Sequence, residues 1–429
     1  MKLFASALLA IATALPSAAA QDVFALRVGR AETIGQGTLD HAVILVENGV
    51  ITVVGQDLPV ERGIPIIDLP DAVVMPGLIN CRTRIGVDGR GGGGADIAAR
   101  ASAELYPRQD VWEELLATGT TTLGIYPPGN GIPGLAAAVR PAGDTVAAMV
   151  LKDPAYLQLY LRSDRGSKKL FTDAFEKLDK YLEKVAKERE KFDKDNEKSK
   201  DKDKDKDKDK DKDKDKDKDK DKDKDKDKDS KKNAPEFKPS QPDDDVRPVL
   251  DLITGRLRAV IGIRKAGDWL HLLDVMGERK FEFDLQCDLR DDLDLFYIAE
   301  EVGKRGLRVI FDPTIIQHPG TRRERSMPAE FAKAGAKLAL SPRSDSVEAH
   351  RDWLNQVGEL VRYGLDRQIA LRAVTLEPAH VLGLGDKLGS IEAGRTANLV
   401  FFDRDPFDPA RRLLGVMLDG RFVSGELLP

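Results

Sequence analysis

The sequence predicts an α/β fold: a (β/α)8 TIM barrel with a composite β-sandwich formed by the N- and C-terminal segments. Three observations support this prediction. The middle of the chain alternates apolar runs of strand length with helical patterns, which favours a parallel sheet. β-rich runs flank an Asn-Gly pair near the N-terminus, and further β-rich runs lie near the C-terminus. The 429 residues, 41% of them hydrophobic, suffice for a barrel and a subsidiary domain.

The N-terminal residues have the pattern of a secretory signal peptide. Met1–Ala20 contains one Lys, the apolar run Leu3–Leu15 and then small residues. The run is too short to span a bilayer comfortably. We therefore expect cleavage before Gln21 and a secreted or periplasmic protein with no membrane span after cleavage. An uncut anchor is the alternative.

The two ends of the chain are predicted to share one β unit. Val43–Glu47 and Val50–Val54 flank Asn48-Gly49, which is a strong hairpin signal. Residues 21–75 cannot bury a core alone. The C-terminal residues 386–429 contain a second hairpin pattern around Asp419-Gly420. We expect these two segments to combine into the β-sandwich, with the barrel inserted between them.

The barrel is predicted to occupy residues 76–190 and 246–385. Its eight strands are expected at Leu78–Arg84, Thr120–Tyr126, Leu135–Arg140, Tyr156–Leu161, Arg258–Ile263, Phe281–Cys287, Leu307–Phe311 and Lys337–Leu340. Helices are expected at Arg108–Ala117, Trp269–Met276, Asp291–Lys304, Pro328–Ala334, Ser346–Tyr363 and Arg367–Val374. Cys81 and Cys287 fall on the first and sixth strands, which are not neighbours. We therefore expect two buried free thiols rather than a disulfide.

A charged insert, residues 191–245, is predicted to interrupt the barrel. It follows an amphipathic helix over Phe171–Lys191. Asp201–Asp229 is a strict Asp-Lys alternation with 15 Asp and 14 Lys. Alternation puts like charges at i and i+4, which disfavours a helix, and leaves no apolar face for a strand. We expect a low-complexity, disordered linker.

The net charge argues against one class of partner, and the glycine pattern argues against one kind of site. The net charge of −5 argues against nucleic acid as a partner. Gly91–Gly94 is a glycine run, but no Lys-Ser/Thr pair follows, so a phosphate loop is not supported. We interpret it as a flexible loop over the barrel mouth.

The first barrel strand ends in an unusual pair of cations. Side chains alternate along a strand, so Arg82 and Arg84 should point the same way and Thr83 the opposite way. Two guanidiniums at the end of a buried strand are costly unless carboxylates or an anionic ligand meet them.

This stretch also carries a family resemblance. Asp71–Gly86 is similar to the first barrel strand of the amidohydrolase superfamily, where Pro-Gly precedes His-x-His; here both His positions are Arg. Gly119–Thr122, Ala370–Ala379 and Leu388–Val400 strengthen the resemblance. The last segment resembles imidazolonepropionase-like amidohydrolases, with Asn398 where Asp is usual.

The resemblance implies one or two divalent metals at the barrel mouth, which would activate water for hydrolysis. The family's ligands are two His on strand 1, a Lys or Glu on strand 4, one His each on strands 5 and 6, and an Asp on strand 8. The corresponding residues here are Arg82, Arg84, Gln158, Gly262, Gln286 or Cys287, and Asp345. Only Asp345 matches. The chain is thus identified as a degenerate member that lacks the metal-binding His residues, with no metal ligands and no cofactor expected. Of the five His, only His318 could reach the mouth.

Three interpretations of the Arg pair stay open. The pair could be structural and bind Asp345 or Asp312, could bind an anionic ligand such as a carboxylate or sulfate, or could serve a hydrolase without the usual metals. We take Asp345 as the catalytic candidate. The candidate ligand-binding residues are Arg82, Arg84, Gln286, Asp312 and Arg343.

Two hypotheses about function follow. The first is an exported pseudoenzyme that binds a small, anionic molecule at the barrel mouth. The alternative is an active hydrolase of carbon–nitrogen bonds in amides or cyclic amides, which would need zinc or another divalent metal. A homo-oligomer, or pairing with an intact paralogue, is a further possibility.

Overall fold

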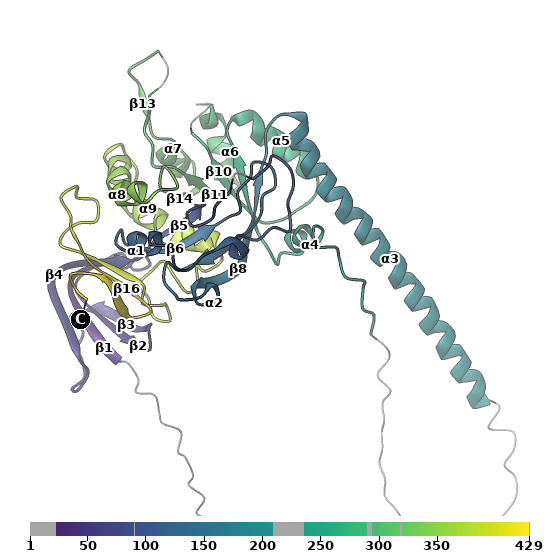
Figure 1. Cartoon of the computed structure of the whole chain (residues 1–429), viewed down its shortest axis with the longest axis horizontal. Coiled ribbons are helices and arrows are strands. Elements are labelled where there is room, and N and C mark those ends of the chain that lie inside the picture. Colours follow the sequence, from purple (N-terminus) through teal and green to yellow (C-terminus); the bar gives the residue numbers. More distant parts are fainter. Residues whose placement is uncertain (1–22, 90, 209–235, 290–293, 318–319, 429) are drawn as a thin grey trace, which may run out of the picture.

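The computed structural model describes residues 23–89, 91–208, 236–289, 294–317 and 320–428. Its two large β-sheets lie side by side, and one long helix projects away from them (Figure 1). Met1–Ala20 and His318 lie outside the described residues, so the signal-peptide prediction and the placement of His318 stay predictions. Within the described ranges, no helix is long and apolar enough to cross a membrane.

The first sheet joins the two ends of the chain. Its order is β17-β16-β15-β4-β1-β2-β3, and antiparallel pairing of β4 with β15 connects the N- and C-terminal strands. The strands are β1 (Val23–Glu32), β2 (Thr38–Glu47), β3 (Val50–Gln56), β4 (Ile66–Pro76), β15 (Leu399–Phe402), β16 (Leu413–Leu418) and β17 (Arg421–Gly425). The predicted union of both ends is thus present as one seven-stranded sheet. Its description as a β-sandwich is not confirmed.

Both predicted hairpins of this sheet are present. Asn48 and Gly49 have φ of 50° and 80°, and Asp419 and Gly420 have φ of 47° and 78°. Positive φ at both central residues suits a tight two-residue hairpin turn. The two turns pack together, since a Cβ on Gly49 would lie 2.5 Å from the carbonyl oxygen of Asp419.

The second sheet has eight strands in the order β14-β11-β10-β9-β8-β7-β6-β5 and is nearly closed into a barrel. Its strands are β5 (Leu78–Thr83), β6 (Thr120–Ile125), β7 (Gly134–Val139), β8 (Val150–Tyr160), β9 (Ala259–Ile263), β10 (Phe283–Cys287), β11 (Arg308–Phe311) and β14 (Lys337–Leu340). The edge strands β5 and β14 approach each other through side chains: the Thr83 hydroxyl, at the end of β5, donates to Asp345 Oδ1, beyond β14, over 2.7 Å. All eight predicted barrel strands are found, although β8 begins earlier than predicted.

The expectation of an all-parallel barrel is wrong at its third strand. β7 runs antiparallel to both neighbours, β6 and β8. A parallel connection needs a crossover of about a dozen residues or more, usually a helix. Residues 126–133 between β6 and β7 contain no helix, and only the single turn α2 (Val146–Met149) precedes β8. Such short connections permit only antiparallel neighbours.

Helices cover the outside of the barrel. One of them closes the end at which the strands begin, opposite the mouth. The remaining ones are α1 (Val111–Leu116), α3 (Arg165–Lys208), α4 (Arg247–Ile253), α5 (Ala266–Met276), α6 (Ala299–Lys304), α7 (Met327–Lys333), α8 (Val347–Arg362), α9 (Arg367–Ala373) and α10 (Leu376–Val381), with 3₁₀ turns η1 (Ala101–Glu104) and η3 (Leu295–Ile298). A short hairpin, β12 (Ile316–Gln317) and β13 (Glu324–Arg325), precedes α7. Ala379 and Val381 of α10 pack against interior residues such as Ile79 and Val260, so α10 plugs the barrel.

The long helix α3 corrects part of the prediction for the insert. It continues through Lys208, so residues 201–208 of the Asp-Lys alternation are helical rather than coil. Residues 209–235 lie outside the described residues. The chain then returns along α3: Tyr181 donates to the carbonyl of Ser240 over 3.0 Å, and the ring of Phe237 lies 5.5 Å from that of Phe192. Figure 1 shows α3 extending well beyond the barrel.

Candidate functional site

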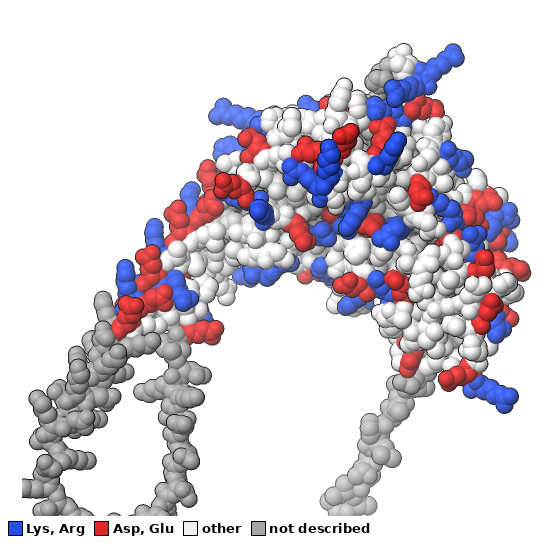
Figure 2. Space-filling model, turned by 180° about the vertical axis from the view of Figure 1, so that it is seen from behind, with Lys and Arg blue, Asp and Glu red and all other residues white. Residues whose placement is uncertain are grey.

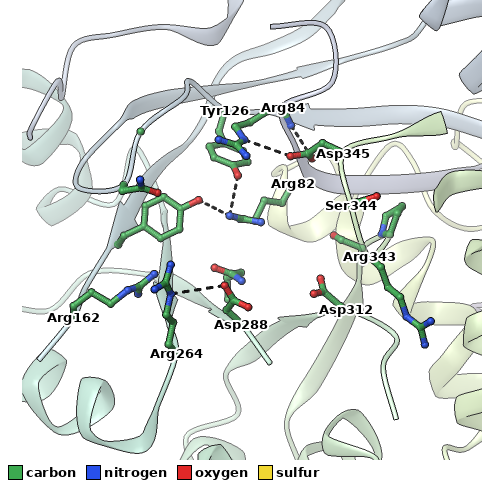
Figure 3. Close-up of a pocket in the computed structure, with 16 residues that line it drawn as sticks. Arg82, Arg84, Tyr126, Arg162, Arg264, Asp288, Asp312, Arg343, Ser344 and Asp345 are labelled. Atoms are coloured by element: carbon green, nitrogen blue, oxygen red, sulfur yellow. Dashed lines mark hydrogen bonds and ion pairs between the residues drawn. The ribbon is translucent and has the colours of Figure 1, made fainter. Parts of the chain in front are cut away.

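A cavity of about 310 Å³ opens at the mouth of the barrel, at the carboxyl ends of the strands. Its lining carries a formal excess of positive charge. The charged side chains that line it are Arg82, Arg84, Arg162, Arg264, Arg343, Asp288, Asp312 and Asp345. Figure 3 shows them gathered around Arg82. The sequence-predicted residues Arg82, Arg84, Gln286, Asp312, Arg343 and Asp345 therefore all reach the same pocket.

Arg82 occupies the centre of this pocket. Its Nη2 donates to the hydroxyl of Tyr126 over 2.9 Å and to that of Tyr160. Its guanidinium carbon lies 4.6 Å and 5.7 Å from the two ring centroids. Tyr126 directly follows β6 and Tyr160 ends β8, so two strands fix the cation. The predicted pairing of Arg82 with Asp345 or Asp312 is not found among its described hydrogen bonds and ion pairs.

The end of β5 departs from simple alternation. Between the pairs Asn80–Leu123 and Thr83–Ile125 the register shifts, because β5 carries one residue more than β6. Such a bulge re-aims side chains. The expectation that Thr83 points away from Arg84 is therefore wrong: both bind Asp345.

Asp345 is held by three donors. The hydroxyl of Thr83 and the backbone N–H of Arg84 donate to Oδ1 over 2.7 and 3.0 Å. Nε of Arg84 lies 3.4 Å from Oδ2, and the Arg84 side chain is 43% exposed. The ion pair predicted for the arginines thus involves Arg84 alone. It lies at the rim of the pocket.

Two arginines that sequence reasoning missed form the opposite side. Arg162 lies two residues after β8, and Arg264 directly follows β9. Nη1 of Arg162 donates to the carbonyls of Leu161 and Gly262 over 2.8 and 2.9 Å. Burial and the neighbouring Arg264 lower the pKa of Arg162. The only signal in the sequence was their position just beyond barrel strands.

The remaining predicted residues differ in how they face the cavity. Gln286 of β10 is buried in the wall. Asp312 follows β11, and its carboxylate points toward the cavity (Figure 3). The guanidinium of Arg343 turns away and donates to the carbonyl of Pro313 over 2.8 Å, so the prediction that Arg343 binds ligand is not supported by its orientation.

The residues present do not fit the metal that the family resemblance implies. Among the described residues, no group of three or more His, Cys, Asp or Glu is placed to hold a metal ion. A catalytic zinc needs three such protein ligands. Apart from Asp345, the positions expected to supply them hold two arginines, a glycine, Gln158, and Gln286 or the buried thiol Cys287. Gln158, the predicted strand-4 counterpart, is buried and donates to the carbonyls of Leu159 and Val260 instead of facing the cavity.

Gly262, where the resemblance places a His, has no room for a side chain. A Cβ there would lie 2.5 Å from the ring of Tyr160 and 2.7 Å from Oε1 of Gln286. Tyr160 is one of the two phenols that hold Arg82. The arginine arrangement and a metal-binding His at residue 262 therefore exclude each other.

Burial sets the protonation state of the phenol and thiol groups at and below the cavity. Burial raises the pKa of Tyr126 far above its usual range, with Arg82 opposing part of the shift, so the phenol stays protonated. Burial likewise raises the pKa of the Cys81 thiol to about 12. Cys81 and Cys287 are both free and buried, as predicted. Neither is a reactive thiolate.

A second contact chain supports the strand that carries Arg82. The backbone N–H of Arg82 donates to Oδ1 of Asn80 over 3.2 Å, and Nδ2 of Asn80 lies 3.1 Å from Nε2 of His350. The other ring nitrogen, Nδ1, is 2.8 Å from the carbonyl oxygen of Ser346. A carbonyl only accepts, so Nδ1 carries the proton and Nε2 accepts from Asn80.

Comparison with known sequences finds similarity in the C-terminal part. The model of the amidohydrolase family matches residues 335–423. An N-substituted formamide deformylase of Arthrobacter pascens is 58% identical over 41 residues, which is 10% of this chain and 8% of that protein. Amidohydrolase tasK of Hapsidospora irregularis is 43% identical over 58 residues, 14% of this chain and 6% of that protein. The matches thus span less than a tenth of either curated relative.

Solved structures match over nearly the whole chain. An amidohydrolase from Thermotoga maritima MSB8 has a TM-score of 0.71 at 20% identity and covers 94% of this chain and 100% of its own. A Xaa-Pro dipeptidase with bound methionine in the active site has a TM-score of 0.52 at 12% identity, over 94% and 100% of the two chains. At these identities the likeness establishes the fold.

Proposed function

We propose that the chain is a member of the amidohydrolase superfamily, which the family match over residues 335–423 and the fold support, and that it binds a small anionic ligand at the barrel mouth in place of metal-dependent hydrolysis. The observation that carries the proposal is Arg82. It occupies a position where the family resemblance expects a metal-binding His, and two phenols from neighbouring parts of the barrel hold its guanidinium at the centre of the cavity.

The charges around Arg82 support an anion as the ligand. Five arginines and three aspartates line the cavity, a formal excess of two positive charges. Arg84 is neutralised by Asp345, whereas burial and Arg264 lower the pKa of Arg162. An anion between these guanidiniums would relieve their mutual repulsion. Planar guanidiniums bind carboxylate and sulfate oxygens well.

Calorimetric titration of the full chain tests the proposal. At low ionic strength, where screening is weak, we expect saturable binding of at least one of acetate, pentanoate, sulfate and phosphate. Arg82→Gln should weaken that binding about tenfold to a hundredfold, because it removes a charge-assisted contact. Arg162→Gln should also weaken the binding. Because the side chain of Arg162 is more accessible than that of Arg82, this variant separates a loss of binding from a folding defect in Arg82→Gln.

Arg343→Gln is the matched control. It removes the same charge from the same cavity lining, but its guanidinium turns away from the centre. Its affinity should stay within about twofold of the wild type, because its guanidinium makes no contact with an anion bound at Arg82 and a charge acting at longer range through water contributes little. Absence of binding by the wild type, or unchanged affinity in both Arg82→Gln and Arg162→Gln, would refute the proposal.

Hydrolysis of carbon–nitrogen bonds is the second candidate function. It is favoured by Asp345, which lies just beyond β14, where the family resemblance places an Asp, and by the names of the relatives. Formamides and cyclic amides are the substrates to assay, with and without added zinc. Turnover that survives Arg82→Gln and disappears in Asp345→Asn would favour this candidate over anion binding.

A further inference from the structure

One uncharged polar side chain in the wall of the mouth cavity has its amide free for a ligand. Gln286 of β10 lines the cavity and is only 8% exposed. Within the described part of the chain, its amide makes no hydrogen bond. By contrast, the buried amide of Gln158 on β8 donates to two backbone carbonyls. Buried amides are usually hydrogen-bonded, so the amide of Gln286 is available to a polar group that enters the cavity.

Gln286 lies beside the residues of the proposed anion site. A Cβ added to Gly262 would lie 2.7 Å from Oε1 of Gln286 and 2.5 Å from the ring of Tyr160, so these two side chains are neighbours. The hydroxyl of Tyr160 accepts from Arg82, and its ring centroid lies 5.5 Å from the guanidinium carbon of Arg162. A group bound at Gln286 is therefore next to an anion bound between Arg82 and Arg162.

The rest of the lining offers polar contacts rather than aliphatic surface. Its uncharged members are tyrosines, serines, amides, a glycine and a proline, and no Leu, Ile, Val, Met or Phe is among the described residues that line the cavity. Most ligand pockets are lined mainly by apolar side chains. A hydrocarbon chain on the ligand would therefore bury little apolar surface against this wall.

From these contacts we infer that the ligand is a short hydroxy acid. Its carboxylate binds Arg82 and Arg162, and a hydroxyl on one of the next two carbons binds the amide of Gln286. The inference rests on the proposed function and adds the uncharged half of the ligand. A hydroxyl both donates and accepts, so it can pair with Oε1 or with Nε2 in either orientation of the amide.

The two arginines keep donors for the carboxylate. Nη2 of Arg82 is bonded to two phenols, and Nη1 of Arg162 is bonded to two backbone carbonyls, so both guanidiniums have fixed orientations. No hydrogen bond within the described residues engages Nη1 of Arg82 or Nη2 of Arg162. Fixed donors bind with little loss of side-chain entropy.

The size of the cavity keeps the ligand short. About 310 Å³ lies at the lower end of the range of ligand pockets, roughly 300–1,000 Å³. Glycolate, lactate and 3-hydroxypropanoate carry the hydroxyl at the two possible positions. Each has a plain counterpart, acetate or propanoate, that lacks only this group.

Calorimetric titration of the full chain with these pairs tests the inference. At neutral pH and low ionic strength, we expect at least one hydroxy acid to bind about threefold to tenfold more tightly than its plain counterpart, as one neutral hydrogen bond allows. Gln286→Met and Gln286→Leu remove the amide and keep an uncharged side chain of similar size. Either variant should lose the preference and keep its affinity for the plain carboxylate within about twofold of the wild type, because that contact is made by the arginines.

Asn130→Ala is the matched control. It removes another amide from the same lining, but this one is exposed in the loop after β6. The preference for the hydroxyl should persist in this variant. If plain carboxylates bind the wild type as well as hydroxy acids do, or if the preference survives in the Gln286 variants or is lost in Asn130→Ala, the inference fails and the proposed function stands. If no carboxylate binds while sulfate or phosphate does, the inference alone fails. If no anion binds, both fail.

Discussion

Arg82 shows how a partly buried cation is accommodated at a barrel mouth. Removing a guanidinium from water is costly unless partners replace its hydration. Tyr126 and Tyr160 supply two hydroxyl acceptors and two ring faces, and cation–π contacts contribute about 2 kcal/mol each when desolvated. Nε of Arg82 is buried without a hydrogen-bond partner in the described part of the chain. The cation is thus held firmly but is incompletely satisfied.

His350 contacts Asn80, which in turn accepts a hydrogen bond from the backbone of Arg82. The burial of His350 predicts that the stability of the fold depends on pH. Burial lowers the pKa of His350, although the carbonyl of Ser346 and the charge of Asp345 oppose this shift. The folded state therefore binds fewer protons than the unfolded state, so this contribution to stability is present above about pH 6.5 and is lost as the pH falls below it. Protonation would also turn Nε2 into a donor facing the amide of Asn80.

Urea unfolding between pH 5 and 8 measures this effect. We expect the free energy of unfolding of the wild type to fall toward pH 5 more steeply than that of His350→Gln. His271→Gln, on α5, is the control and should keep the wild-type pH dependence. Equal pH dependence in the wild type and His350→Gln would contradict the assignment.

The residues of the site were only partly predictable. Arg82, Arg84 and Asp345 were found because a resemblance marked the ends of the first and last barrel strands. Arg162 and Arg264 lie in no motif, and only the strand ends place them beside Arg82. Arg343 lies at the cavity, where the sequence placed it, but its guanidinium points away from the centre. The sequence could not predict this orientation, because it depends on one hydrogen bond to the carbonyl of Pro313.

At the scale of elements, a buried ionic cluster fastens the closed end of the barrel. Nη1 and Nε of Arg308, at the start of β11, lie 2.9 Å from Asp284 of β10 and 3.0 Å from Glu377 of α10. Arg372 of α9 reaches the same Glu377 over 2.8 Å, and Arg258 lies 3.2 Å from Asp284. The cluster thus ties two barrel strands to the helices that plug the barrel.

Removing the central cation should be strongly destabilising. Arg308→Met leaves Asp284 and Glu377 buried with fewer partners, and breaking a buried pair in this way costs about 3–5 kcal/mol. Urea unfolding at pH 7 measures the loss. Arg305→Met, whose side chain makes an exposed ion pair with Glu301, is the control and should cost about 1 kcal/mol or less. Equal losses in the free energy of unfolding of the two variants would show that the buried cluster stabilises the fold no more than an exposed ion pair does.

The strands were easier to predict than their directions. Apolar runs bounded by turn residues located all eight barrel strands, because fully buried strands leave a strong local signal. Direction depends on what connects the strands. The connections on either side of β7 are too short for a crossover helix, a constraint that the expected repeat of strand and helix obscured.

At the scale of the whole molecule, the cationic pocket is a local feature. The chain carries a net charge of −5, and the face in Figure 2 mixes acidic and basic side chains. Along α3, pairs such as Lys169–Asp173 and Arg189–Asp193 balance each other. The excess of arginine at the barrel mouth therefore does not follow from composition, and it is consistent with selection for a ligand there.

The central claim is that fixed guanidiniums have taken the place of bound metal at the mouth of this barrel. Anomalous diffraction at the zinc edge, from crystals of the full chain soaked in zinc, tests it most directly. We expect no zinc peak in the cavity around Arg82. A zinc ion bound there by Asp288, Asp312 or Asp345 would contradict the account.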